Sequence, residues 1–227
     1  MNNSFGKSKS AIITLIGIVV MTILIIMKLF QPESLYSGYA MLFGIACFFI
    51  VEAVDKTPDD QSGVRFKSIL SDLKKPQVLL WVLLPIGLTI AEIVGGKLFF
   101  EAADRKYIDH VIGRTSLEMD FSNFLNWILV SAVTVVGEEI AFRGFLFGKS
   151  SKVLPKWACF LLSAALFALG HMASGNSVIV FYDLALIFLD AIMYALAYQY
   201  SGNCIISYIP HCLNNILGLL LVRALFM

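Results

Sequence analysis

The stretch SAVTVVGEEIAFRGFLFG, residues 131–148, decides how this chain is interpreted. It is apolar enough to span a lipid bilayer, yet it carries Glu138, Glu139 and Arg143. Each ionisable side chain at bilayer depth costs roughly 2.5–3.5 kcal/mol on insertion scales. A membrane segment that keeps three such side chains is expected to use them, so function is the first explanation to consider.

Composition places the chain among integral membrane proteins. Of its 227 residues, 59% are hydrophobic and only 15% are charged, and the mean hydropathy is +0.82, far from the balance of soluble domains. The formal net charge of +1 offers no basic surplus for binding nucleic acid. The four cysteines lie in or beside apolar stretches without CxxC spacing, so we interpret them as small buried side chains, neither a disulfide framework nor a zinc site.

Apolar stretches of spanning or near-spanning length predict the fold class, which is all-α: a polytopic transmembrane bundle of about seven helices with a polar cavity inside the membrane. The predicted spans are roughly 11–30, 36–54, 77–100, 122–148, 157–172, 178–200 and 204–222. The first is interpreted as a retained helix, because its apolar stretch is long and no small-residue cleavage site follows it. Without internal repeats, one membrane domain is the simplest organisation.

The lysines and arginines near the ends of these spans predict the orientation, because cytoplasmic loops carry an excess of them. One side holds Lys7, Lys9, Lys56, Arg65, Lys67, Lys74, Lys75, Arg143, Lys149, Lys152 and Lys156, and the other holds Lys28, Lys97, Arg105, Lys106, Arg114 and Arg223. The count is 11 against 6, or 10 against 6 without Arg143. We therefore expect a multi-pass protein of the cell membrane whose N-terminus, 55–76 loop and 149–156 loop are cytoplasmic.

Polar residues within the spans gather at one depth. Besides the two glutamates and Arg143, His171 closes the fifth span, and His211 and Asn215 share the seventh. A helix rises 1.5 Å per residue, which places Glu138 roughly 15 Å, His211 roughly 12 Å and His171 roughly 22 Å from the cytoplasmic ends of their segments. With tilting, the three side chains meet near mid-membrane. We expect them to line a conical polar cavity that opens toward the cytoplasm.

The two glutamates are expected to have different roles. Glu139 and Arg143 are four residues apart, share one face of a helix and can neutralise each other as an ion pair. Glu138 is rotated onto the adjoining face and has no obvious partner. A carboxylate without a partner in a low-dielectric site suits a general base near neutral pH.

Each of the other clustered residues has a structural alternative. His171 can cap the end of its helix by binding a backbone carbonyl. His211 follows Pro210, so it sits in a first turn or at a kink, where a capping role is also open. Asn215 can bridge two helices, as can its neighbour Asn214. A shared site is favoured because two His, two Glu and one Asn converge from three segments.

Several further residues stay without an assigned role. Glu92 lies in the third span, and Asp183 and Asp190 lie seven residues apart on one face of the sixth, where they either support the site or bind a neighbouring helix. His110 is expected in a loop. The 55–76 segment is either a basic amphipathic stretch on the inner leaflet or a solvated loop.

The motifs together resemble one protein family. They read EExxxR at Glu138-Glu139-xxx-Arg143, FxxxH at Phe167-xxx-His171 and HxxxN at His211-xxx-Asn215. In order, spacing and membrane setting they resemble the CPBP family of intramembrane proteases, which is named after CAAX proteases and bacteriocin processing and includes the type II CAAX prenyl endopeptidases and the Abi-type proteins of bacteria. The chain is most similar to the bacterial branch. The resemblance implies a catalytic core at 121–227 and, at 1–120, helices without a catalytic motif.

The resemblance implies hydrolysis of peptide bonds in the membrane, with a membrane peptide or a lipidated protein as substrate and membrane lipids as surroundings. By carry-over, Glu138 with His171 would polarise the attacking water, and His211 with Asn215 would bind the developing oxyanion. The remaining motif residues, Glu139 and Arg143, would shape the site.

The family is commonly described as metalloproteases, and this implies a second assignment. In it, His171, His211 and either Glu138 or Glu139 hold a zinc ion that activates the water. The sequence has no contiguous HExxH motif, but ligands from separate helices can still form a site. The sequence does not decide between the metal-free assignment and the zinc assignment.

Two other classes of function stay open. One is a catalytically silent membrane scaffold or bacteriocin self-immunity factor that binds a partner's transmembrane segment, against which the intact motifs argue. The other is a proton- or ion-coupled transporter, which also needs polar groups at mid-membrane, although no inverted repeat favours it. The substrate and the oligomeric state do not follow from the sequence.

Overall fold

The computed structural model describes residues 2–100, 106–115 and 124–226. Every regular element in this part of the chain is a helix, as the all-α class predicts. The longer helices are α1 (Asn2–Phe30), α2 (Tyr36–Asp55), α4 (Pro76–Phe100), α6 (Phe124–Glu138), α7 (Lys156–Gly170), α8 (Ser177–Ser201) and α9 (Cys204–Phe226). The shorter elements are η1 (Asp59–Gln61), α3 (Ile69–Leu73), α5 (Lys106–Thr115), the π-helix η3 (Glu139–Lys149) and η4 (Ser150–Lys152).

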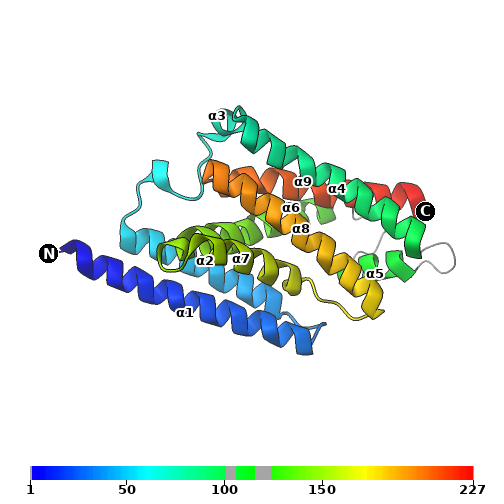
Figure 1. Cartoon of the computed structure of the whole chain (residues 1–227), viewed down its shortest axis with the longest axis horizontal. Coiled ribbons are helices and arrows are strands. Elements are labelled where there is room, and N and C mark those ends of the chain that lie inside the picture. The colour runs from blue at the N-terminus through cyan, green and yellow to red at the C-terminus, as the bar shows by residue number, and fades with distance from the viewer. Residues whose placement is uncertain (1, 101–105, 116–123, 227) are drawn as a thin grey trace.

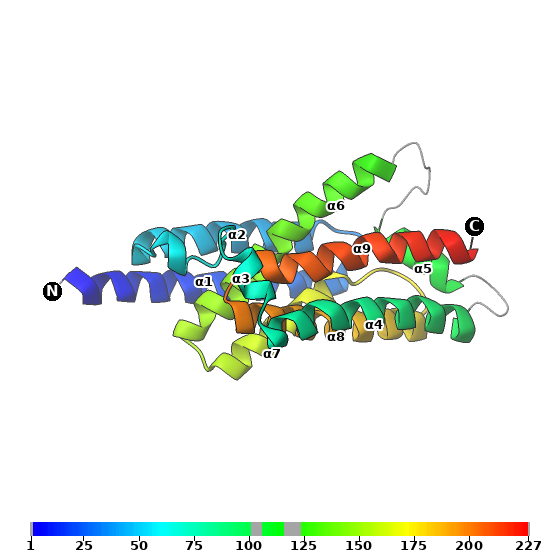
Figure 2. The same cartoon turned by 90° about the horizontal axis from the view of Figure 1, so that it is seen from above.

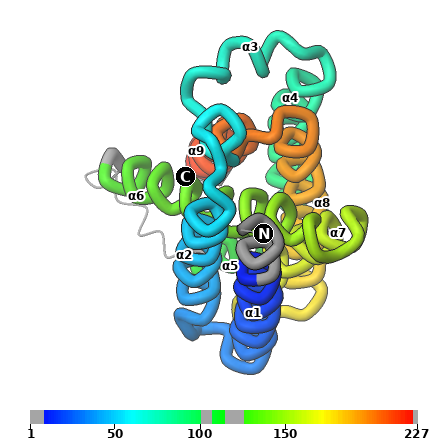
Figure 3. Tube along the Cα trace, turned by 90° about the vertical axis from the view of Figure 1, so that its left-hand side faces the viewer, coloured from blue at the N-terminus to red at the C-terminus, as the bar shows by residue number. Residues whose placement is uncertain are grey.

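The long helices run up and down along a common axis (Figure 1). On one side of the molecule α1 packs against α2, and on the other α4 packs against α8 and α9. Between these two groups lie η3 and α7, as the view along the axis shows (Figure 3). The chain alternates direction, so the N-terminus, the 56–75 segment and the 150–155 turn share one end of the bundle (Figure 1).

The number of membrane spans differs from the sequence prediction. Among the described residues, five helices are long and apolar enough to cross a membrane: α1, α2, α4, α8 and α9. The fourth predicted span is α6 continued by η3, and the fifth is α7, an apolar helix of only 15 residues. The count of seven is therefore not confirmed, whereas the multi-helix membrane architecture is.

The sequence predicts one continuous α-helix for the segment that carries the two glutamates, but the structure has two kinds of helix there. It changes at Glu139 into the π-helix η3, whose backbone N–H groups reach the carbonyl five residues back, and the Ser150 N–H still points to the Phe145 carbonyl. Every residue of η3 except Gly148 is buried. Because apolar and buried residues surround this helix on all sides, its sequence has no polar face from which the helical period could be determined.

Small residues let other helices approach η3 closely. A Cβ atom on Gly144 would lie 2.9 Å from the Phe48 ring and 3.0 Å from the Cys204 sulfur. From the facing side, a Cβ atom on Gly44 of α2 would lie 2.9 Å from the Cβ of Ala141. These contacts place η3 at the centre of the bundle and remove its charged residues from lipid.

Ion pairs and a tight turn close the end of the bundle that holds the N-terminus. Lys149 lies 2.7 Å from Glu52, and Lys152 lies 2.8 Å from Asp55, so the end of η3 is tied to the end of α2. Asn203 accepts a hydrogen bond from the Arg65 backbone N–H and donates one to its carbonyl. The α8–α9 turn and the 56–75 segment are thereby held together at this end.

The segment between α2 and α4, residues 56–75, is mostly irregular backbone. Its regular structure is limited to η1 and the five-residue α3. Phe66 and Leu70 are 71% and 76% exposed, while Ile69 and Leu73 pack against α4 and α9. Only part of its apolar surface is therefore used within the molecule.

The residues between the third and fourth predicted spans also contain more structure than the sequence had indicated. His110 is not in a loop but on helix α5, where it is buried and binds Asp183 of α8 at 3.2 Å. The expected loop residues 101–105 and 116–120 lie outside the described residues. Helix α5 thus becomes a wall of the site described next.

Candidate active site

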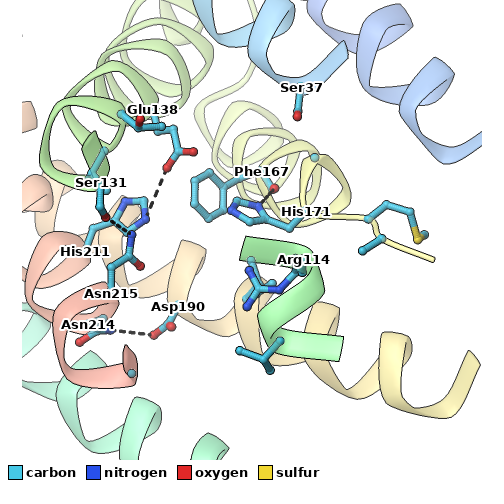
Figure 4. Close-up of a pocket in the computed structure, with 18 of the residues that line it drawn as sticks. Ser37, Arg114, Ser131, Glu138, Phe167, His171, Asp190, His211, Asn214 and Asn215 are labelled. Atoms are coloured by element: carbon cyan, nitrogen blue, oxygen red, sulfur yellow. Dashed lines mark hydrogen bonds and ion pairs between the residues drawn. The ribbon is translucent and has the colours of Figure 1, made fainter. Parts of the chain in front are cut away.

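One cavity of about 1080 Å³ brings together all four candidate catalytic residues. Glu138 comes from the end of α6, His171 from the residue after α7, and His211 and Asn215 from α9. Figure 4 shows these side chains around a common space. Glu139 and Arg143 do not line this cavity and are completely buried beside it.

The cavity opens at the end away from the N-terminus, so the expected cytoplasmic opening and the expected cytoplasmic N-terminus do not both hold. Its outer walls are the 32–38 segment, helix α5, the first half of α6, the 170–174 segment and the second half of α9. These parts lie toward the end of the bundle opposite the N-terminus (Figure 1). The N-terminal end is instead closed by the Lys149–Glu52 ion pair and the packing around η3. The number of residues along a span predicts the depth of a side chain in the membrane. The end at which the cavity opens depends on the packing between helices, which this count does not predict.

Glu139 and Arg143 form the ion pair that their spacing predicts, with 3.0 Å between a guanidinium nitrogen and Glu139 Oε1. Both side chains have no exposed surface. The guanidinium also donates to the Ala191 carbonyl at 3.3 Å and lies 4.2 Å above the centre of the Phe167 ring. These contacts offset part of the desolvation cost of a buried ion pair.

His211 lies between the two glutamates. Its Nδ1 is 2.8 Å from Glu139 Oε1, and its Nε2 is 3.5 Å from Glu138 Oε2. Because a carboxylate only accepts hydrogen bonds, Glu139 fixes a proton on Nδ1 and orients the ring. Glu139 therefore positions His211 in addition to its pairing with Arg143. In the structure Glu138 faces His211, whereas the family resemblance pairs it with His171.

Of the two positions predicted for His211, a first turn or a proline kink, the structure excludes the first turn. Helix α9 begins at Cys204, so Pro210 lies inside the helix and His211 is not in its first turn. Pro210 has no N–H to donate to the preceding turn, which interrupts the backbone hydrogen bonds beside the site. The histidine is consequently set well inside the bundle and is 4% exposed.

His171 caps the end of α7, as its structural alternative had suggested. The backbone turns away after Gly170, and Nδ1 lies 2.8 Å from the Phe167 carbonyl, to which it donates. With Nδ1 acting as donor, the neutral ring presents its Nε2 lone pair as an acceptor. Capping and lining the cavity are therefore compatible, because they use different ring nitrogens.

Both asparagines bridge helices. Asn215 donates to the Ser131 hydroxyl of α6 at 3.3 Å and lines the cavity. Asn214 donates to the Tyr194 hydroxyl of α8 at 2.9 Å and reaches Asp190 at 3.4 Å. The amide of Asn215 has two N–H groups, so its contact with Ser131 leaves one for another acceptor.

Tyr194 is a site residue that sequence reasoning missed. Its ring stacks on the His211 imidazole with 4.7 Å between centroids and 15° between planes. The sequence offers one signal only, which is that Tyr194 and Asp190 are four residues apart on the same helix face. An aromatic residue in an apolar helix is otherwise indistinguishable from core.

A second group of polar residues lies in the outer part of the molecule, where α5 meets α4 and α8. Asp183 binds both His110, at 3.2 Å, and Arg114, at 2.9 Å. Glu92 accepts a hydrogen bond from the Tyr107 hydroxyl at 3.1 Å. Asp183 and Asp190, whose roles were open, are thus divided: Asp183 holds α5, and Asp190 faces the site beside α9.

The candidate zinc ligands are not arranged for a metal ion. Nδ1 of each site histidine is hydrogen-bonded, which leaves Nε2 as the nitrogen that could bind a metal, and Glu139 is paired with Arg143. Among the described residues, no three His, Cys, Asp or Glu side chains gather as a metal site. A zinc site needs at least three protein ligands at about 2.0–2.3 Å, and the donors of this cavity do not supply them in this arrangement.

Comparison with known proteins gives a match to a protein family. Residues 120–217 match the family model described as type II CAAX prenyl endopeptidase Rce1-like. The matched range contains the three motifs, with α6, η3, α7, α8 and the first part of α9, and it excludes α1 to α5. No curated protein and no solved structure matches the chain.

Proposed function

We propose that this chain is an intramembrane endopeptidase that acts on membrane peptides or lipidated proteins. The match of residues 120–217 to the Rce1-like family model supports this proposal. The observation that carries the proposal is the pair of Glu138 and His211 on the wall of a polar cavity, 3.5 Å apart, with His211 oriented by Glu139. A carboxylate that can take a proton from water and an oriented imidazole that can donate to an oxyanion, on the wall of one cavity, are what such a hydrolysis requires.

In the proposed reaction Glu138 is the general base. It takes a proton from a water molecule while the water oxygen attacks the carbonyl carbon of the peptide bond. The carbonyl electron pair moves onto its oxygen and gives a tetrahedral oxyanion. Glu138 then returns the proton to the amide nitrogen as the carbon–nitrogen bond breaks, so no other reactant is consumed. His171 orients the water molecule, because its Nε2 accepts a hydrogen bond from the second O–H of the water.

The oxyanion is bound by His211 and Asn215. When protonated on both nitrogens, His211 donates Nδ1–H to Glu139 and presents Nε2–H toward the cavity. Asn215 supplies the N–H that its contact with Ser131 leaves free. Two donors on α9, four residues apart and therefore on one face, can bind the same oxygen.

Location and cofactor are part of the same proposal. The protein lies in the cell membrane with residues 121–227 as its catalytic core, and its N-terminus is cytoplasmic, which the excess of lysine and arginine at that end supports. Zinc is not assigned a step, because the donors present do not fit it. Cleavage is therefore expected to continue in a strong zinc chelator, and a loss of cleavage that added Zn²⁺ restores would contradict this assignment.

The test compares membrane peptides from cells that express the wild-type protein, Glu138→Gln or Asp59→Asn, using mass spectrometry. Glu138→Gln keeps the size of the side chain and removes the base, so the substrate precursor is expected to accumulate. Asp59→Asn is the matched control, because it makes the same chemical change on exposed η1 outside the cavity. This control is expected to resemble wild type.

Two outcomes would overturn the proposal. The first is that no precursor accumulates with Glu138→Gln although the variant is folded and inserted. The second is that purified wild-type protein in liposomes fails to cut any peptide whose level changes in cells. A biological role that survives Glu138→Gln and His171→Ala would favour a scaffold or immunity factor instead.

A further inference from the structure

We propose that Tyr194 is a positioning residue for His211: its ring fixes the plane of the imidazole, and Asn214 and Asp190 fix Tyr194. The inference rests on the proposed function, in which His211 binds the oxyanion. Tyr194 belongs to none of the three motifs. It comes from α8, which also contributes the Asp190 side chain and the Ala191 carbonyl to the hydrogen bonds around the site.

The first observation is that His211 is held on several sides. Its face lies on Tyr194, nearly parallel, at 4.7 Å, and the Phe167 ring meets it edge to face at 5.4 Å and 77°. Glu139 holds Nδ1 at 2.8 Å. A rotation of the imidazole about its side-chain bonds would lose these contacts together, so Nε2 is kept facing Glu138 and the cavity.

The second observation is that Tyr194 is itself anchored. Its hydroxyl accepts a hydrogen bond from Asn214 Nδ2 at 2.9 Å, and the same amide reaches Asp190 at 3.4 Å. Tyr194 is 2% exposed, Asn214 5% and Asp190 9%. Asn214 follows His211 by three residues on α9, so the bridge sets the spacing of α8 and α9 beside the histidine.

The third observation is the orientation of the two rings. Neutral aromatic rings prefer an edge-to-face or offset arrangement, whereas a cation gains by lying over the face of a tyrosine. The near-parallel contact, with 4.7 Å between centroids, is an offset stack that a neutral imidazole also favours, and it keeps the doubly protonated imidazole of the oxyanion role over the tyrosine face. The Arg143 guanidinium also lies over the rings of Tyr194 and Phe167, at 5.3 Å and 4.2 Å from their centres. The same two rings therefore hold His211 and the cation that pairs with Glu139.

Figure 4 shows part of this arrangement: Asn214 and Asp190 are joined by a dashed line below His211 and Asn215. Misplacing a reacting group by about 1 Å can cost roughly 100-fold in rate. Removal of the Tyr194 ring is therefore expected to lower kcat by about 10- to 100-fold. KM is expected to change less than kcat, because the proposed role of Tyr194 is to hold His211 in place.

The experiment uses Tyr194→Leu, Tyr194→Phe and the control Tyr198→Leu in the full-length protein. Tyr198 lies one turn further along α8 and packs on Phe147 at 5.7 Å, so the control makes the same change on the same helix away from His211. Protein with isotope-labelled histidine is studied by NMR in nanodiscs. The chain has only three histidines, so substitution assigns their signals.

An aromatic ring shifts the signals of protons above its face upfield. The His211 ring protons are expected to show this shift in wild type, Tyr194→Phe and Tyr198→Leu, and to lose it in Tyr194→Leu. In parallel, cleavage of the peptide found with Glu138→Gln is measured. Tyr194→Phe is expected to keep kcat within about threefold of wild type, the loss of one hydrogen bond, whereas Tyr194→Leu is expected to show the full decrease.

The positioning role is overturned if the His211 shift persists in Tyr194→Leu, or if Tyr198→Leu lowers kcat as much as Tyr194→Leu. The NMR measurement does not need catalysis. An inactive wild-type protein would therefore refute the proposed function while the histidine shifts still decided whether Tyr194 holds His211.

Discussion

At the scale of the residue, the completely buried pair of Glu139 and Arg143 connects stability to the site. Arg143 neutralises Glu139, and Glu139 in turn holds Nδ1 of His211. Removing one partner of a buried ion pair leaves a charge without compensation, whereas removing both charges does not. The pair should therefore respond very differently to single and double substitution.

Arg143→Met is expected to destabilise the protein by about 3–5 kcal/mol, because Glu139 stays buried without its cation. Adding Glu139→Gln to the same protein is expected to recover most of this loss, since no charge then remains. Thermal unfolding in detergent measures both. Activity is expected to stay low in the double variant, because the carboxylate that orients His211 is gone. A single variant as stable as wild type would show that the ion pair does not hold η3.

Asn215 and Ser131 allow the oxyanion assignment to be tested. Asn215→Leu removes a proposed oxyanion donor and is expected to lower kcat about 100- to 1000-fold. Ser131→Ala removes only the acceptor that holds the amide at 3.3 Å, so a decrease of less than about tenfold is expected. Both are measured with the same peptide. Equal effects of the two substitutions would indicate that Asn215 serves as a bridge between α6 and α9 and not as a donor to substrate.

Spacing in the sequence predicted part of the site but not all of it. The i,i+4 relation predicted the Glu139–Arg143 ion pair, which the structure contains. It could not predict that Glu138 faces His211, because contacts between helices depend on how they are rotated against each other. Tyr194 was missed for the same reason, since stacking on His211 requires α8 and α9 to be adjacent.

At the scale of the element, the π-helix η3 is the feature that the sequence did not predict. Long π-helices are rare, and short π-helical turns are frequent at functional sites. The π-helical hydrogen-bond pattern, which spans five residues instead of four, begins at Glu139, directly after Glu138. The change in helical geometry thus occurs between the two glutamates, one of which lines the cavity while the other is buried.

Gly144 tests the close packing of η3. Gly144→Ala is expected to cost about 1–3 kcal/mol, because its Cβ would lie 2.9 Å from the Phe48 ring and 3.0 Å from the Cys204 sulfur. Gly87→Ala on α4 is the matched control, since among the described residues no atom lies within 4 Å of the added Cβ. The control is expected to be neutral or slightly stabilising because alanine favours the helix. Equal unfolding temperatures for both variants would contradict this account of the packing.

At the scale of the whole molecule, the arrangement of the helices separates the cavity from the basic end. The view from above shows α6 leaning away from the other helices toward the end where the cavity lies (Figure 2). The basic loops at 56–75 and 149–156 lie at the opposite end. With a cytoplasmic N-terminus, the cavity would open away from the cytoplasm.

This topology is tested with a thiol reagent that does not cross membranes. Asp60→Cys and Gln31→Cys, each introduced alone after replacement of the four native cysteines, are expected to react from opposite sides of the membrane, because the 56–75 segment and the α1–α2 turn lie at opposite ends of the bundle. If lysine and arginine set the orientation, Gln31→Cys reacts in intact cells and Asp60→Cys only after lysis. Labelling of both from one side would contradict the arrangement of α1 and α2 as a membrane-crossing pair.

The sequence by itself determined that this is an all-helical membrane protein with two glutamates, two histidines and an asparagine in its spans, because hydrophobic length and the cost of charge in lipid are local properties. The ion pair of Glu139 and Arg143 could also be predicted, because it depends only on their spacing within one helix. Only the tertiary structure decided that Glu138 faces His211, that Tyr194 stacks beneath it and that the cavity reaches the end opposite the N-terminus. These features depend on the rotation and packing of separate helices, and a single helix does not encode them.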